Sequence, residues 1–110
     1  MPLILNGKTI RTNREGFLTD ASSWCPEVAE LLCETHGIYP GDTHWEIINL
    51  IRDYCAEGNE PPSMRELVKE VRQRLTLDKA KSIYLMKLFG SSPAKMAARL
   101  AGLPKPKNCL

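Results

Sequence analysis

The chain has 110 residues, of which 43% are apolar and 25% are charged, and its formal net charge is +2 at pH 7. That length favours one domain with its own apolar core, and the small net charge by itself does not indicate a nucleic-acid binder. No apolar run approaches the roughly 20 residues of a membrane span, and the first residues lack the basic start and long apolar stretch of a signal peptide. We therefore expect a cytoplasmic protein with no membrane partner and with reduced thiols.

The first predicted element is a β-hairpin over about residues 3–12. Two short apolar segments flank Asn6-Gly7, and a two-residue hairpin turn needs positive φ at both positions, which Asn and Gly tolerate. A lone two-stranded hairpin is marginally stable in water, so we expect it to pack on helices. Residues 13–20 are expected to form a turn-rich connector.

Two helices are predicted next. The first has Ser22 or Ser23 as its N-cap and Pro26 in its first turn, where a missing N–H does no harm. The second begins with a capping box of Thr43 and Glu46 and runs to about residue 57. Its apolar residues cover more than one narrow stripe, so we expect this helix to be buried on several sides and central.

Three further helices complete the predicted body. One begins with a capping box of Ser63 and Glu66 and has a regular apolar spacing. Another is predicted over residues 78–89. The last opens with Ser92 as its N-cap and Pro93 at its first position, carries small alanines that permit close approach, and ends at Gly102 in the left-handed conformation. The exposed face of the helix after Ser63 is a candidate basic docking face, formed by Arg65, Lys69 and Arg72.

The fold class is therefore mainly α: a small N-terminal β-hairpin packed on a bundle of about five helices over residues 1–102, followed by a flexible arm over residues 103–110. Pro104 and Pro106 prevent a helix in the arm and favour extended backbone. From residue 103 to residue 109 the arm would reach about 23 Å. The candidate residues for the arm and its contacts with partners are Gly102, Leu103, Pro104, Lys105, Pro106 and Lys107.

Four cysteines occur, at positions 25, 33, 55 and 109. No C-x-x-C pair and no zinc spacing is present, so we expect neither a metal nor a cofactor. Cys25, Cys33 and Cys55 are interpreted as structural or incidental thiols of the helical body. Cys109 lies on the arm, where a thiol can be carried into the pocket of another protein; the alternative is a frayed tail with an incidental cysteine.

A series of motifs runs along the whole chain. The motifs are Gly16-Phe17-Leu18, Trp24, His44-Trp45-Glu46-Ile47-Ile48, Arg52-Asp53-Tyr54, Pro62 with Arg65, Leu67-Val68-Lys69, Tyr84-Leu85, Leu88-Phe89, Ser92-Pro93-Ala94-Lys95, Ala101-Gly102-Leu103-Pro104-Lys105-Pro106 and Cys109.

Together these motifs resemble the DsrC/TusE sulfur-relay family. The resemblance implies that Cys109 carries sulfur as a persulfide. It also implies an upstream sulfurtransferase complex of the TusBCD/DsrEFH type, and a downstream tRNA-thiolating enzyme acting with tRNA on wobble 2-thiouridine. The chain would then be a sulfurtransferase-type enzyme, a persulfide carrier that acts either with turnover or stoichiometrically.

One position distinguishes the branches of this family. Members that resemble the sulfite-reduction type carry a second arm cysteine eleven residues before the penultimate one, and here that position is Ala98. Alanine cannot attack a persulfide, so the resemblance favours the TusE-like branch. The alternative is a DsrC-like partner of dissimilatory sulfite reductase or of sulfur oxidation.

A hypothesis of another class is a helix-turn-helix that binds nucleic acid. The helix with Arg65, Lys69 and Arg72 follows another helix, and basic side chains bind phosphates. Glu66 and Glu70 interrupt the basic face, and the connection between the two helices is longer than the usual tight turn. This hypothesis also leaves the arm without a role.

Overall fold

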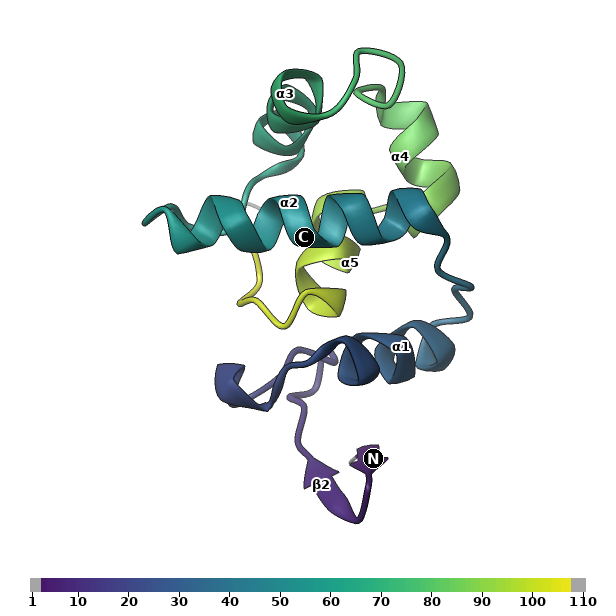
Figure 1. Cartoon of the computed structure of the whole chain (residues 1–110), viewed down its shortest axis with the longest axis vertical. Coiled ribbons are helices and arrows are strands. Elements are labelled where there is room, and N and C mark those ends of the chain that lie inside the picture. Colours follow the sequence, from purple (N-terminus) through teal and green to yellow (C-terminus); the bar gives the residue numbers. More distant parts are fainter. Residues whose placement is uncertain (1–2, 108–110) are drawn as a thin grey trace.

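The computed structural model describes residues 3–107. The described chain forms a two-stranded antiparallel hairpin, one 3₁₀ turn and five α-helices (Figure 1). The predicted fold class, mainly α with an N-terminal hairpin, is confirmed. The elements are β1 (Leu3–Leu5), β2 (Lys8–Ile10), η1 (Ala21–Ser23), α1 (Pro26–Thr35), α2 (Asp42–Ala56), α3 (Met64–Arg74), α4 (Ser82–Phe89) and α5 (Pro93–Leu100).

The hairpin has the predicted turn. Asn6 and Gly7 have φ values of 51° and 79°, as a turn with positive φ at both central positions requires. Leu3 pairs with Ile10 and Leu5 with Lys8, and the ladder ends there, short of residue 12. β1 packs against α1, so the hairpin is supported by the helical body.

The start of α1 differs from the prediction. Neither Ser22 nor Ser23 caps it: the residue before the helix is Cys25, which makes no side-chain capping bond, and Pro26 opens the helix as predicted. Asp20 instead accepts hydrogen bonds from the backbone N–H and the hydroxyl of Ser22, so the serines belong to η1. The extra turn separates the serines from the helix, which the capping preference alone could not reveal.

The start of α2 also differs. The helix begins at Asp42 with Gly41 as its N-cap, so Thr43 and Glu46 do not form a capping box. The His44 Nδ1 atom accepts the Gly41 N–H at 3.0 Å, and Glu46 pairs with Lys79 at 2.9 Å instead. The side chain of His44, three residues after the N-cap Gly41, therefore takes the capping role that was predicted for Thr43 and Glu46.

α3 begins as predicted, with the reciprocal hydrogen bonds of Ser63 and Glu66. α4 begins at Ser82 and not near residue 78. Residues 77–79 form a turn, in which the Ala80 N–H donates to the Leu77 carbonyl oxygen. That turn places Ala80 in the core.

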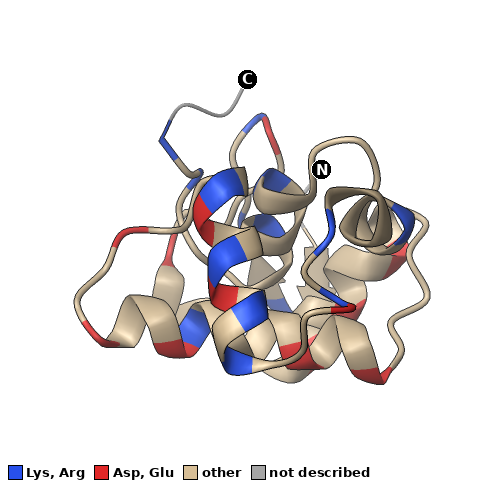
Figure 2. Cartoon of the chain, turned by 90° about the horizontal axis from the view of Figure 1, so that it is seen from above, with Lys and Arg blue, Asp and Glu red and all other residues tan. Residues whose placement is uncertain are grey.

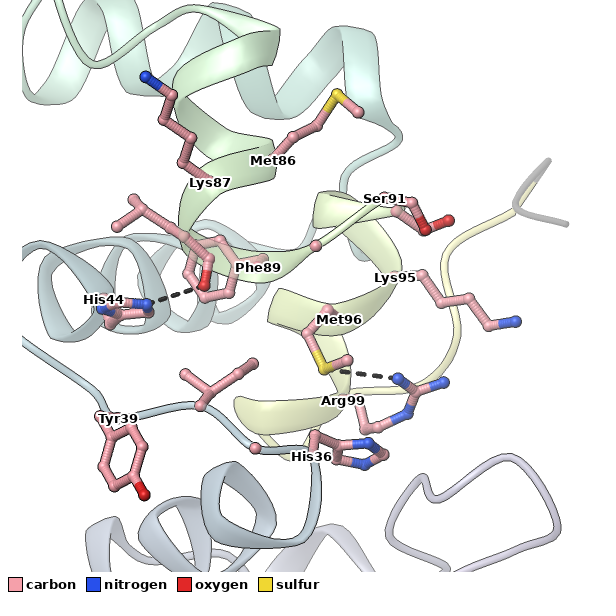
Figure 3. A pocket seen from close by; sticks show the side chains of 15 residues that line it. His36, Tyr39, His44, Met86, Lys87, Phe89, Ser91, Lys95, Met96 and Arg99 are labelled. Carbon is pink, nitrogen blue, oxygen red and sulfur yellow. Dashed lines mark hydrogen bonds between the residues drawn. The ribbon is translucent and has the colours of Figure 1, made fainter.

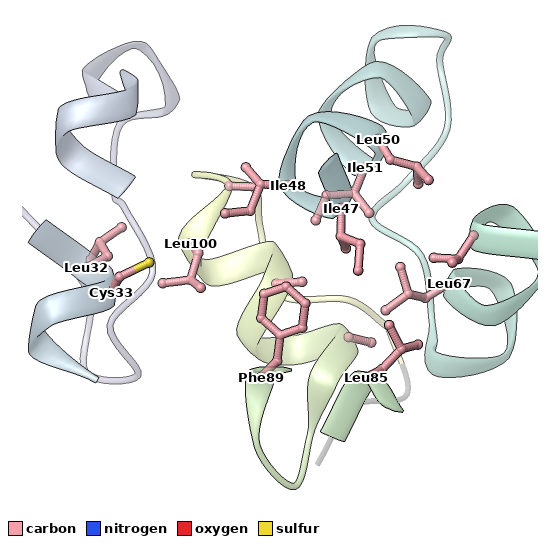
Figure 4. Close-up of a cluster of buried hydrophobic side chains, with 14 of the residues drawn as sticks. Leu32, Cys33, Ile47, Ile48, Leu50, Ile51, Leu67, Leu85, Phe89 and Leu100 are labelled. Atoms are coloured by element: carbon pink, nitrogen blue, oxygen red, sulfur yellow. The ribbon is translucent and has the colours of Figure 1, made fainter. Parts of the chain in front are cut away.

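α5 is the helix around which the others pack. It contacts α1, α2, α3 and α4, and its alanines at 94, 97 and 98 are buried. Small side chains let neighbouring backbones approach closely, so α5 fits between the other helices. α2 is buried on several sides, as expected, but shares the centre with α5. The largest buried side chains lie around α5 and α2 (Figure 4); they include Leu32, Ile47, Ile48, Ile51, Leu67, Leu85, Phe89 and Leu100.

Candidate functional site

The end of α5 is where the arm leaves the body. The Gly102 N–H donates to the Arg99 carbonyl oxygen at 3.2 Å, and the Leu103 N–H donates to the Ala98 carbonyl oxygen at 3.0 Å. Gly102 has φ +72°. This pair of bonds with a left-handed residue is a Schellman motif, which ends the helix as the sequence predicts.

Two side chains from elsewhere in the chain hold the last carbonyl groups of α5. The Trp24 Nε1–H donates to the Leu100 carbonyl oxygen at 2.8 Å. The Arg52 Nη1 atom, from α2, donates to the Ala101 carbonyl oxygen at 2.8 Å. The Arg52 guanidinium also lies over the Trp24 ring, 3.8 Å from its centroid. We call Trp24 and Arg52 the root clamp, because together they satisfy carbonyl groups that a helix end leaves without an intrahelical partner.

Gly102 is in direct contact with the root clamp. A Cβ atom at this position would come within 2.6 Å of the Trp24 Cγ atom, closer than two carbon atoms approach without repulsion. Glycine is therefore required at 102 for two reasons: its positive φ and the aromatic ring that lies against it.

The described part of the arm lies against the body. Pro106 is buried, whereas Lys105 and Lys107 are exposed. The Lys105 Nζ atom pairs with the Glu15 Oε1 atom at 3.2 Å, and the Lys107 Nζ atom with the Glu60 Oε2 atom at 3.0 Å. We call these two contacts the arm ion pairs. Arm mobility stays a prediction.

Glu15 sits in a turn built by Asn13. The Asn13 side-chain oxygen accepts the N–H groups of Glu15 and Phe17. Arg99 donates to the Glu15 carbonyl oxygen at 2.8 Å, and Lys95 lies 3.9 Å from the Glu15 carboxylate. The hydrogen bond from Lys105, with the charges of Lys105, Lys95 and Arg99, lowers the pKa of Glu15. Glu15 is thus an ionised acceptor that connects the N-terminal connector, α5 and the arm.

A mostly apolar groove of about 450 Å³ lies beside the arm. One of its walls is the end of α2 with the following loop, and the other is the arm itself. The side chain of Cys55 lines this groove. Its lining residues are Cys55, Asn59, Glu60, Pro61, Leu103, Pro104, Lys105 and Lys107.

The cysteines differ in exposure. Cys33 is fully buried, and burial together with Glu30 raises the pKa of its thiol to about 11. Cys25 and Cys55 are half-buried, and burial also raises the pKa of Cys55. A high pKa means little thiolate at neutral pH and weak nucleophilicity. Cys109, the predicted sulfur-carrying residue, lies outside the described residues.

The predicted basic docking face is present but not continuous. Arg65, Lys69 and Arg72 are exposed on α3. Arg74, in the last turn, is bound by Glu57 and Glu70 at 2.6 and 2.8 Å. Along α3, Lys and Arg alternate with Glu (Figure 2).

Another pocket, of about 720 Å³, lies away from the groove at Cys55, between the end of α1 and the loop from α4 to α5. His44 donates its Nε2–H to the Leu88 carbonyl oxygen at 2.9 Å and meets the Phe89 ring edge-on (Figure 3). Burial, with repulsion from Arg99, lowers the pKa of His36. We assign this pocket no role in the chemistry of the arm.

The structure brings together residues that sequence reasoning did not connect. Trp24 and Arg52 appeared in the family motifs with no assigned role, and only their contact with the end of α5 gives them one. Glu15 and Glu60 were not predicted at all, and no local pattern marks them, because their partners are 90 and 47 residues away in the chain. Beyond the root, the predicted arm residues contact the body through Lys105, Pro106 and Lys107.

Comparison with known proteins identifies relatives that match nearly the whole chain. A family model described as "DsrC like protein" matches residues 4–110. Sulfurtransferase TusE of Escherichia coli strain K12 is 41% identical over 108 residues, which is 98% of this chain and 99% of that protein. A TusE homolog of Haemophilus influenzae is 41% identical over the same share. These proteins define a class of small, single-domain relatives named as sulfurtransferases.

Solved structures give the same result. The NMR structure of Allochromatium vinosum DsrC has a TM-score of 0.89 and 38% identity, with both chains fully covered. The oxidised γ-subunit of dissimilatory sulfite reductase from Archaeoglobus fulgidus, DsrC, has a TM-score of 0.83 and 38% identity, again with full coverage. The chain belongs to the DsrC-like family.

Within residues 3–107 no helix has the length and apolar character needed to cross a membrane. Nor does any group of three or more His, Cys, Asp or Glu side chains there have a metal-binding arrangement.

Proposed function

We propose that this protein is a sulfur-relay carrier that accepts a persulfide sulfur on Cys109. The observation that carries the proposal is the arrangement at the end of α5: a chain exit fixed by the root clamp, with Cys109 seven residues beyond Gly102. The relatives named sulfurtransferases support it. A carrier needs an accessible thiol on a tether, and the described cysteines are buried or half-buried in the body.

The transfer step uses no external oxidant. The Cys109 thiolate attacks the outer sulfur of a donor persulfide, a new S–S bond forms on Cys109, and the donor S–S bond breaks with its electron pair leaving on the donor thiolate. Delivery repeats the step with Cys109 as the leaving thiolate. Lys105 and Lys107 would favour the thiolate.

We further propose, from the family, an upstream sulfurtransferase complex of the TusBCD/DsrEFH type and a downstream tRNA-thiolating enzyme bound to tRNA, in the cytoplasm. The second candidate is a DsrC-like partner of sulfite reductase, favoured by the structural relatives from that system. Ala98 argues against it, because that position holds no second thiol with which Cys109 could bridge a sulfur.

Mass spectrometry tests the assignment. After incubation with glutathione persulfide, the C-terminal peptide of the wild type should gain the mass of one sulfur atom. Cys109→Ser should abolish loading with little change in melting temperature, and Cys55→Ser is the matched control that should load normally. Sulfur found on Cys25, Cys33 or Cys55 while Cys109 stays unmodified would refute the proposal.

A deletion strain separates the two candidates. Loss of this protein should abolish tRNA wobble thiolation and leave sulfite reduction unchanged. Normal tRNA thiolation in the deletion strain would favour the sulfite-reductase candidate.

The nucleic-acid hypothesis is separated by binding in solution. Duplex DNA should bind weakly and lose affinity as salt rises, because only phosphate contacts would contribute. Sequence-specific binding at physiological salt would favour a helix-turn-helix instead.

A further inference from the structure

The end of α5 is held more firmly than a helix terminus requires. Its last carbonyl groups usually bind water or capping residues, yet here the carbonyl oxygens of Leu100 and Ala101 each accept a 2.8 Å hydrogen bond from a distant side chain. Trp24 comes from the segment before α1 and Arg52 from α2. The positive guanidinium also lies at the helix C-terminus, where the helix dipole favours a cation.

The same two residues fix the direction in which the chain leaves. The Trp24 ring lies against Gly102 and leaves no room for a Cβ atom there. The Arg52 guanidinium covers the ring, 3.8 Å from its centroid. Because the Schellman bonds of Gly102 and Leu103 form on this surface, a shift of the ring would tilt the first residues of the arm.

A tilt at the root matters because the arm is long. From residue 103 to residue 109 the chain spans about 23 Å when extended, so a rotation of about 20° at the root would displace its tip by about 8 Å. Attack on a persulfide needs the reacting atoms about 3–3.5 Å apart. The arm ion pairs act further out and are exposed, so they can guide the arm but are screened by salt.

We propose that Trp24 and Arg52 are positioning residues for sulfur transfer: the root clamp fixes the direction of the arm so that Cys109 enters the pocket of a protein partner. This inference rests on the proposed function. Neither residue acts on the sulfur itself, and their effect is transmitted through the end of α5. Transfer to or from a protein therefore depends on the clamp, whereas reaction with a small persulfide does not.

The test compares two donors on full-length variants of the protein. Trp24→Phe removes the Nε1–H donor and keeps a ring beneath Gly102, and Arg52→Met removes the guanidinium at similar length. Trp45→Phe and Arg11→Met are the matched controls, since Trp45 lies on α2 and packs against the apolar core, and Arg11 is exposed. Loading rates of Cys109 are measured with two donors. One is glutathione persulfide, and the other is the persulfide-loaded upstream sulfurtransferase complex from the organism that produces this protein.

We expect Trp24→Phe and Arg52→Met to lower loading from the protein donor at least fivefold while loading from glutathione persulfide stays within twofold of wild type. Amide hydrogen exchange at Gly102 and Leu103 should accelerate at least tenfold, with α2 amides unchanged. Arg52→Lys, which keeps a cation, should recover part of the protein-donor rate. Both control variants should match the wild type with either donor.

Other outcomes overturn the inference. Unchanged loading from the protein donor, despite faster exchange at Gly102 and Leu103, would mean that the clamp does not position the arm. Equal losses with both donors would mean that the clamp acts on thiol reactivity or folding. If Arg52→Met does not fold, Trp24→Phe decides by the same criteria. Loading that persists in Cys109→Ser would overturn the proposed function instead, and the exchange data would still report whether the clamp exists.

Discussion

The root of the arm and its outer part are held by different physics. At the root, the carbonyl groups of Leu100 and Ala101 are fixed by hydrogen bonds from half-buried side chains, and Gly102 lies flat against an aromatic ring. Further out, Lys105 and Lys107 meet exposed carboxylates. Close packing is insensitive to salt and tolerates no added atom, whereas exposed ion pairs contribute little and weaken with salt. From this contrast we expect the root to stay fixed, while residues 105–107, which we call the strap, can separate from the body.

The largest expected effect is at Gly102, where the arm leaves α5. Gly102→Ala should destabilise the protein by about 2–4 kcal/mol, because the new Cβ atom must adopt positive φ and also meets the Trp24 ring. Gly37→Ala is the matched control: Gly37 also follows a helix, with φ +71°, but has no atom within 4 Å of its Cβ position. It should cost only the backbone strain, about 1 kcal/mol. Urea unfolding measures both, and equal losses would show that ring contact contributes nothing.

Breaking the arm ion pairs should change the backbone mobility of the arm far more than the free energy of unfolding of the protein. Glu15→Gln with Glu60→Gln removes both arm ion pairs, so backbone order parameters for residues 103–107 should fall towards values typical of flexible chain. Glu46→Gln is the control, since it breaks the pair with Lys79, which lies away from the arm and has an exposure similar to that of the Lys105–Glu15 pair. NMR relaxation measures the change. Unaltered order parameters would show that burial of Pro106, and not charge, holds the arm.

A pH titration separates the contribution of His36, at the end of α1, from that of Glu15, which pairs with the arm. Burial and Arg99 lower the pKa of His36, so the unfolded state binds the proton more tightly and stability should fall as pH drops from about 7 towards 5. Lys105, together with the other cations near it, lowers the pKa of Glu15, so its contribution is lost only as pH falls below its ordinary range. His36→Gln should flatten the melting temperature between pH 7 and 5. A slope that His36→Gln leaves unchanged would assign it to another group.

The smallest expected effect concerns Ala98. Its side chain is fully buried on α5, so Ala98→Cys places a thiol within the body, where burial raises its pKa and slows exchange. Mild oxidation should leave Cys109 of the wild type free or paired between chains. In Ala98→Cys an internal disulfide should form only slowly, because the two Cα atoms must come within about 7 Å and the arm must lift for the new thiol to be reached. Peptide mapping distinguishes these products. A disulfide from Cys109 to Cys25, Cys33 or Cys55 in untreated protein would contradict this expectation.

Local chemistry decided much of the fold. Asn6-Gly7, the capping box at Ser63, Pro26 and Pro93 at helix starts, and Gly102 at a helix end were all predicted correctly, because each depends on φ preferences or on bonds within four residues. Three predicted helix starts were wrong, because a neighbouring segment or side chain formed another structure. Ser22 belongs to a 3₁₀ turn, and His44 caps α2 in place of the pair of Thr43 and Glu46. Asp78 lies in a turn that buries Ala80.

The sequence by itself thus determined the class of fold, the place where the last helix ends and the arm begins, and the cysteine that the arm carries. Only the tertiary structure decided that α5 lies among four helices, that Trp24 and Arg52 grip its end, and that Glu15 and Glu60 bind the arm. The physical reason is range. A cap or a turn is fixed by residues adjacent in the chain, whereas Trp24 meets Leu100 across 76 positions and Lys105 meets Glu15 across 90, and such contacts exist only once the helices have packed.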